Sequence, residues 1–543
     1  MSDDSFFSND DVTRYLCAAA RTDEKFSDKV VSALLGNDLH AVAPSVGFSL
    51  SPVLRHCLDA QSQRFRRDWL LLGLLLLAFV LSPLWLILAL VLLLPLGGWL
   101  SATAQFGRIR DVVLALASIA VLLLVTAQLV SVLDTTESSA APPSWPVGMP
   151  WLSVLAILAA YGVVVADEMK TRQILVRTLS RAGFDASDAP ALPASRAWAA
   201  DRLNDVERSS GGNTTIYHGF SPFVGYGPVV SHWSFALPTR RKEDRSSSNG
   251  SDLVPLDVLA LINFVRRRLD TLGADPDQLS GLTVTDRVFL RGDALTRYPK
   301  VLPERDRMPT QELSESDVER IAADPSGPAR HHLCVRVPSW GAEVVATTFL
   351  HFSTEGKLLH VRCDQAVLGP LRKPYHDVDR LTETFSADQM GQVLAGAATG
   401  LVGTLARAPV SIVRELLSRR WERERARARA LAAQDLGYDY GARGCVRELA
   451  MDTEYHDYFQ TTDAAKHLKL VERHALSAVL DFLDEHDVDT TEFRNRQMTI
   501  LNQGVIQTGG ISSIGNQAVG AGANATQSSV AATGTQPDAG RPN

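Results

Sequence analysis

Two histidines on neighbouring predicted strands are the first candidates for chemistry. Alternating apolar residues predict strands over Val344–Phe352 and Lys357–Val367, and a two-residue turn at Glu355-Gly356 would join them as a hairpin. In that register His351 lies opposite His360 on the polar face. A metal centre needs three or four convergent ligands, and the next pair on this face supplies none. The pattern therefore favours a solvated histidine pair, and we expect no metal ligand and no cofactor.

An acidic run near the C-terminal end is the second candidate. Asp487-Val-Asp489-Thr-Thr491 formally resembles the DxDxT phosphotransfer motif of haloacid-dehalogenase-type enzymes. That motif ends a buried hydrophobic strand, whereas here it follows the polar stretch Asp484-Glu485-His486. We therefore expect the end of a helix leading into a turn. No Walker loop, GxGxxG, GxSxG, HExxH or kinase signature is present, so the catalytic residues of any enzyme here are unknown.

Composition excludes several classes of protein. The chain has 543 residues, a formal net charge of −7 and 21% charged residues, and this acidic balance argues against general nucleic-acid binding. Its 5 cysteines are scattered and form no CxxC pair. Disulfides and cysteine-ligated zinc are therefore both unexpected.

The longest apolar run places a membrane block upstream of these candidates. Nothing charged stands between Asp68 and Arg108, and two more apolar stretches follow. At ~1.5 Å per residue the first run is too long for one span, and Pro83 offers a turn within it. We expect a transmembrane region over 66–168, with spans of about 68–82, 84–101, 112–133 and 151–167.

Charge placement sets the expected orientation of this block. Arginines precede and follow the first run, and the loop Asp134–Pro150 between the later stretches holds two acids and no bases. Positive charge prefers the cytoplasmic side, which predicts four crossings and cytoplasmic termini in a bacterial plasma membrane. The spans carry few polar residues, so a passive anchor is favoured over a transporter or channel component.

The rest of the chain divides into three parts. Residues 1–65 predict an N-terminal cytosolic helical segment, including a helix over Glu24–Leu35. Residues 169–495 predict a cytosolic α+β domain with mainly antiparallel pairing, in which Thr215–Leu237 looks like a hairpin. Its helices include a small-residue helix, Met390–Leu405, ended by Arg407 and Pro409, and an amphipathic helix over Ala464–Glu485. The expected fold class is therefore a membrane protein: an α-helical transmembrane block with a cytosolic α+β domain and a low-complexity tail.

The tail, residues 496–543, has no charged residue from Gln497 to Pro537. Aliphatic residues recur every five or six positions, with Asn, Gln and Gly between them, a composition that favours stacked strands. The possible assembly residues are Val505, Ile506, Gln507, Gly509, Ile514, Gly515 and Asn516. A flexible tail without assembly function is the alternative.

Two resemblances accompany these patterns. Ile506-Gln507-Thr508-Gly509 resembles the core of RHIM-type amyloid signalling motifs, although Thr508 replaces an aliphatic residue and Ser512 stands where Asn belongs. The chain as a whole resembles multi-pass membrane proteins of actinomycetes, a likeness that implies no activity. Three segments carry it: Phe220-Ser221-Pro222-Phe223-Val224-Gly225, Val337-Pro338-Ser339-Trp340-Gly341 and Met498–Ile506.

The leading hypothesis from the sequence is a membrane-anchored, non-enzymatic interaction or signalling protein that self-assembles through its tail. Its expected partners are the lipid bilayer and copies of itself, through the transmembrane block or the tail. The alternative is a membrane-bound enzyme whose site is built from scattered residues. Converging His, Asp or Arg side chains in Thr215–Leu371 would favour the enzyme, and a shallow solvated surface would favour the interaction protein.

Overall fold

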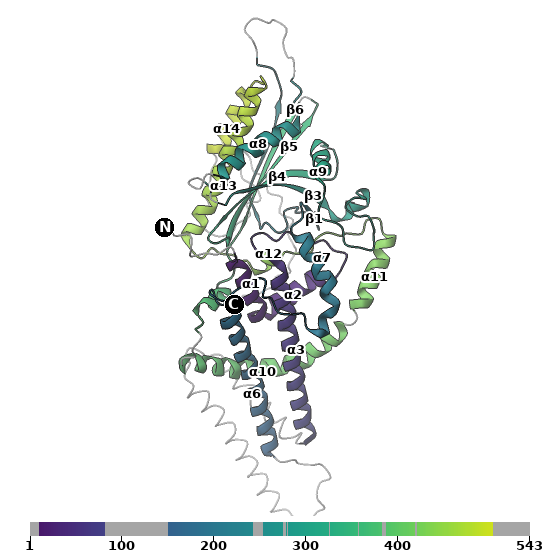
Figure 1. The fold of residues 1–543 in the computed structure, drawn as a ribbon, viewed down its shortest axis with the longest axis vertical. Helices are drawn as coiled ribbons and strands as arrows, with labels where there is room; N and C mark the ends of the chain where they lie inside the picture. Colours follow the sequence, from purple (N-terminus) through teal and green to yellow (C-terminus); the bar gives the residue numbers. More distant parts are fainter. Residues whose placement is uncertain are drawn as a thin grey trace, which may run out of the picture.

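The fold is that of a computed structural model, which describes residues 10–81, 150–242, 254–274, 279, 281–324, 326–356, 358–382, 387–418 and 421–502. A sheet with its covering helices lies at one end of the long axis, and helices project from the other end (Figure 1). Short segments around α12 (Val446–Ala450) lie where the two parts meet.

The sheet part contains six strands and the helices that pack with them in the described chain. They are β1 (Thr214–Tyr217), β2 (Val229–Pro238), α8 (Val258–Gly273), β3 (Thr283–Arg291), η3 (Gly292–Arg297), α9 (Glu315–Ala323), β4 (Arg330–Ser339), β5 (Val344–Glu355), β6 (Leu358–Leu368), α13 (Tyr458–Glu485) and α14 (Thr491–Asn502). The remaining elements are α1 (Asp11–Thr22), α2 (Glu24–Leu35), α3 (Leu50–Leu81), α6 (Pro150–Thr178), η2 (Ala194–Ala199), α7 (Ala200–Ser210), η4 (Lys373–Arg380), α10 (Ala387–Ser418) and α11 (Trp421–Gln434).

The strands form one six-stranded sheet in the order β1-β3-β4-β5-β6-β2. All its pairings are antiparallel except β1 with β3, which is parallel. The expected mainly antiparallel pairing is thus confirmed, and so is a β5–β6 hairpin, but its expected turn at Glu355-Gly356 is wrong because Glu355 pairs with Leu358. The expected hairpin over Thr215–Leu237 is wrong, because β1 and β2 lie at opposite edges of the sheet. Adjacent extended runs in sequence need not pair when other strands can be inserted between them.

Each face of the sheet has its own apolar layer. On one face α8 and α13 pack over Leu350, Phe352 and Val361, because their apolar residues recur at helical spacing. The predicted amphipathic helix Ala464–Glu485 lies within α13, and its apolar residues Leu468 and Leu483 are buried. On the other face the loop before β2 lays aromatic side chains over Phe289 and Phe349.

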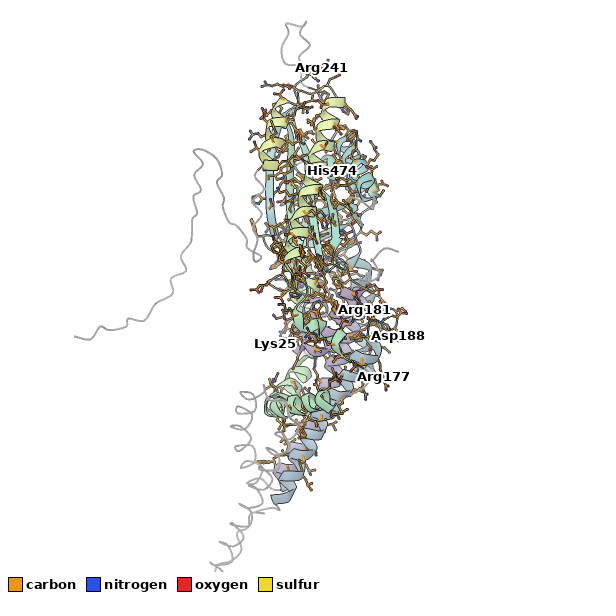
Figure 2. All side chains as sticks on the ribbon, turned by 90° about the vertical axis from the view of Figure 1, so that its left-hand side faces the viewer. Lys25, Arg177, Arg181, Asp188, Arg241 and His474 are labelled. Atoms are coloured by element: carbon orange, nitrogen blue, oxygen red, sulfur yellow. The ribbon has the colours of Figure 1, made fainter. Side chains whose placement is uncertain are left out.

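The N-terminal helices form a separate core beside the sheet. α1, α2 and the first half of α3 pack with α7, η4 and α12 around residues such as Leu16 and Leu54. The predicted helix Glu24–Leu35 has the same bounds as α2. Figure 2 shows Lys25, Arg177 and Arg181 in this helical part, and His474 on α13 and Arg241 in the sheet part. The described part of the N-terminal segment therefore packs on the downstream domain.

No single helix among the described residues is long and apolar enough to cross a membrane. The end of α3 covers most of the predicted span 68–82, but Arg64, Arg66 and Arg67 precede it in the same helix. In α6 the apolar stretch from Trp151 ends at Asp167, short of the ~20 residues that a span needs. The predicted four-crossing membrane fold and plasma-membrane localisation are therefore wrong on the described residues; spans 84–101 and 112–133 lie outside them.

The boundary arginines have partners within the protein instead. Arg67 forms ion pairs with Asp68 at 2.9 Å and with Asp167 at 3.1 Å, which joins α3 to α6. The helix α10 crosses both, and its Leu401 and Ala397 bury Leu71 and Ala160 (Figure 1). Some of the apolar residues that suggested membrane spans are thus buried where α3, α6 and α10 pack together.

The course of α10 also differs from expectation. Arg407 and Pro409 do not end this helix, which continues to Ser418 with Pro409 inside it. The two stretches Gln389–Ala398 and Gly403–Val413, bent by 49°, are the one pair in the described chain that together have the length and composition of a span. The bend lies between Ala398 and Gly403, whereas the carbonyl with which the Pro409 ring clashes belongs to Leu405, within the second stretch, so the proline does not account for the bend.

Candidate metal centre

The loop between β4 and β5 presents a buried carboxylate. Trp340, Gly341 and Ala342 have φ values of 54°, 62° and 63°, and the Glu343 amide donates to the Trp340 carbonyl at 3.1 Å. Left-handed backbone at a residue with a side chain costs about 1–2 kcal/mol, so the surroundings must enforce it. They do so in part through Trp340, whose Nε1 donates to Asp463 at 3.1 Å. The loop thereby holds the Glu343 side chain at 9% exposure.

A fully buried arginine supports this loop from behind. Arg447 donates to the main-chain carbonyl of Glu343 and, at 3.3 Å, to that of Val46. Burial lowers the pKa of Arg447 to about 10, while the charge of Glu343 opposes that shift. The guanidinium thus holds the backbone of the loop in place behind the Glu343 carboxylate.

The second residue, His376, lies on η4. Its Nε2 donates to Glu343 Oε1 at 2.5 Å, and its ring lies 4.4 Å from that of Tyr15. Burial lowers the pKa of His376, but the hydrogen bond and charge of Glu343 outweigh this and raise it. The other ring nitrogen, Nδ1, is buried and has no hydrogen-bond partner among the described residues.

The helix α1 fixes the position of η4. Asp379 accepts from Arg14 Nη1 and from the Tyr15 hydroxyl, both at 2.6 Å. At the other end of η4, the hydroxyl of Tyr375 donates to Asp23 at 2.9 Å. These contacts hold His376 between the helical part and the sheet part.

The third residue, His456, precedes α13. Its backbone amide donates to Gln460 Oε1 at 2.9 Å, within the capping box that starts the helix at Asp457. Its Nε2 donates to Asp452 Oδ2 at 3.1 Å, and Asp452 in turn donates its amide to Pro370 at 2.8 Å. A histidine that ligates a metal commonly donates its other ring N–H to a carboxylate, which fixes the orientation of the ring.

Glu343, His376 and His456 converge. Each offers one ligand atom, and these atoms lie within 4.8 Å of one another. Two imidazoles and one carboxylate form a ligand set for Zn²⁺ or non-haem iron that leaves coordination positions open. Tetrahedral ligands lie about 3.3 Å apart at bond lengths near 2.0 Å, so small side-chain rotations would close the site around an ion.

The sequence-predicted histidine pair is not brought together. In the observed register His351 pairs with Arg362 and His360 with Ser353, a shift of two residues that leaves each side chain on its expected face. The acidic run forms a turn after α13, as expected: Asp487 has φ 55° and Asp489 Oδ1 accepts from the Thr491 amide at 3.0 Å. The predicted assembly residues of the tail lie outside the described residues.

Sequence reasoning missed the converging set. Its members stand at positions 343, 376 and 456, in a turn, a short 3-10 helix and a helix cap, and no spacing rule links such elements. One local signal existed, the Trp340-Gly341-Ala342 turn before an acid, but its geometry becomes visible only through the backbone angles.

The comparisons with known proteins give one match. The AbeC-like domain matches residues 232–516, a region that includes all three converging residues and Asp452. No curated protein and no solved structure matches the chain.

Proposed function

This chain belongs to the AbeC-like family, and we propose that it is an interaction protein that binds a divalent transition-metal ion through Glu343, His376 and His456. The observation that carries the proposal is the convergence of the three ligand atoms within 4.8 Å, from segments far apart in the chain. An ion there would connect the sheet loop, η4 and the start of α13. Metal binding would thus stabilise the junction between the two parts of the molecule.

The His376–Glu343 hydrogen bond makes metal binding compete with a proton. Because Glu343 raises the pKa of His376, the imidazole must release a proton before it can ligate. Affinity should therefore rise with pH, and binding should release protons. The three ligands also leave room for a water or a partner's side chain in the coordination sphere.

The test is Zn²⁺ binding by the full-length chain after chelator treatment, measured by calorimetry. We expect one ion per chain, with His376→Ala and His456→Ala each weakening binding by at least about 100-fold, and Asp452→Asn by about 10-fold. His360→Ala is the matched control and should leave affinity unchanged. No binding, or equal binding by the wild type and the two alanine variants, would refute the proposal.

A second candidate function is homotypic assembly through the tail. The family match continues to residue 516, so it includes the possible assembly residues from Val505 to Asn516. This supports a role for the segment as part of the domain. Full-length protein should then form fibres with a spacing of ~4.7 Å, and Val505→Asp with Ile506→Asp should abolish them, because like charges would repeat in every layer. A wild-type chain that stays monomeric at high concentration would contradict it.

A further inference from the structure

A second group of polar side chains lies at the β1 edge of the sheet. β1 pairs in parallel with β3, and Tyr217 forms a parallel bridge with Ala442, whose amide donates to Ile216 at 3.0 Å. The next residues along these segments are His218, Gly292 and Arg443. Ligands of sheets with parallel strands bind beyond the carboxyl ends of those strands.

The backbones at this edge approach each other more closely than a side chain would allow. A Cβ on Gly441 would lie 2.4 Å from the His218 amide nitrogen, and one on Gly292 would lie 2.2 Å from the Gly441 amide nitrogen. Glycine is therefore required at both positions, since real Cβ atoms do not approach so closely. The contact fixes the backbone that carries the polar side chains.

Three of these side chains form a connected chain of hydrogen bonds. Asp439 Oδ1 accepts from the Gly441 amide at 2.8 Å, and its Oδ2 is hydrogen-bonded to His218 Nδ1. Arg443 Nη1 lies 3.2 Å from His218 Nε2. Because a guanidinium only donates, Nε2 is the acceptor and Nδ1 carries the proton that Asp439 accepts.

The group combines fixed geometry with access to solvent. The side chain of His218 is 43% exposed and that of Asp439 26%. A second arginine, Arg291, stands at the end of β3 and pairs with Asp293. None of these residues belongs to the candidate metal centre.

We propose that His218, Asp439 and Arg443 form a binding site for a phosphate group, either free phosphate or a phosphate monoester. Arg443 binds the anionic oxygens, a role for which guanidinium geometry is suited. Bound phosphate takes the place of the Arg443–Nε2 contact, and His218 Nε2 accepts a hydrogen bond from the P–OH of the monoanion. Asp439 accepts from Nδ1 and so keeps Nε2 as the acceptor that faces the ligand.

The experiment follows the reactivity of His218 Nε2 toward diethyl pyrocarbonate in the full-length protein, with each histidine quantified by peptide mass spectrometry. Inorganic phosphate at ten times its dissociation constant should slow modification of His218 about tenfold, because only about a tenth of the sites stay free. The exposed His360 is the internal control, and sodium chloride at equal ionic strength is the control for salt.

Two variants make the result decisive. Arg443→Gln should abolish phosphate protection, and Arg443→Lys should retain part of it. His376→Ala should leave the protection intact, which separates this site from the metal centre. Equal protection of His218 and His360, or full protection in Arg443→Gln, would overturn the proposal. Acetate that protects as well as phosphate would also overturn it, by showing a general carboxylate site.

Discussion

Two groups of histidines in this protein have opposite chemistry. His376 and His456 each contact a carboxylate, and burial is incomplete, with 26% and 17% of their side chains exposed. On the sheet, His332 lies between aromatic rings, 5.1 Å from Phe289, and 5.0 Å from the ring of His351. Glu343 raises the pKa of His376, whereas burial lowers the pKa of both His332 and His351.

The difference shows what turns a histidine into a candidate ligand. His351 Nδ1 donates to the carbonyl of His331 at 2.7 Å, so its polar group is satisfied within the sheet. In the other group a carboxylate and a free Nδ1 remain available at the junction. Clustering alone does not make a site; the carboxylates beside His376 and His456 distinguish this group from the sheet group.

The largest expected effect is a charge placed in the sheet group. His332→Glu should lower the free energy of unfolding by about 3–5 kcal/mol at pH 8, because the carboxylate would be buried without a partner. His332→Phe, the control, should change it by less than about 1.5 kcal/mol. Urea denaturation measures both, and similar effects of the two substitutions would show that the site is not closed to water.

Next in size is stabilisation by metal. Zn²⁺ at 100 times its dissociation constant should add about 2.7 kcal/mol to the free energy of unfolding of the wild type. It should add nothing to His376→Ala, and the full amount to His351→Ala. Thermal unfolding with and without chelator provides the measurement. Equal stabilisation of all three proteins would place the ion elsewhere.

A smaller effect is the pH dependence of the metal-free protein. The raised pKa of His376 adds stability below the unfolded pKa of about 6.5, and this is lost as the pH rises through the folded pKa. His376→Gln should therefore lower the free energy of unfolding by about 1.5–3 kcal/mol at pH 5.5 and by less at pH 8. A difference that grows with pH would contradict the assignment. His332→Gln should show the opposite trend, because a buried neutral histidine stabilises only above that range.

The smallest effect tests the hairpin register. His351 pairs with Arg362 and not with His360, so the two histidines should not interact. A double-mutant cycle with His351→Ala and His360→Ala should be additive within about 0.5 kcal/mol. A larger coupling energy would support the register expected from the sequence, in which His351 lies opposite His360.

Local patterns predicted the elements better than their partners. The helical periodicity of Glu24–Leu35 and the alternation of apolar residues in β5 and β6 are patterns of residues close in sequence, and these elements were confirmed. The β1–β3 pairing depends on strands inserted between β1 and β2, which no local pattern reports. The apolar end of α3 suggested a span because hydropathy does not distinguish lipid from a crossing helix such as α10.

The site was hidden for the same reason. His351 and His360 are close in sequence and drew attention, although the register places them two residues out of step rather than opposite each other. Glu343 and His456 are brought together by a turn of left-handed residues and by a helix cap. Such features depend on tertiary contacts, among them the bond from Trp340 to Asp463, and these are absent from any single window of sequence.

The bridge between Tyr217 and Ala442 has a consequence for association between chains. An outermost strand exposes unpaired amides and carbonyls, which invite strands from other molecules. Along β1 the segment around Ala442 occupies part of that position, and at the opposite edge β2 carries a bulge between Val229 and Ser231 and ends at Pro238. Bulges and prolines both discourage strand addition. The folded sheet is thus a poor template for edge-to-edge growth, and fibres of this protein would have to begin elsewhere in the chain.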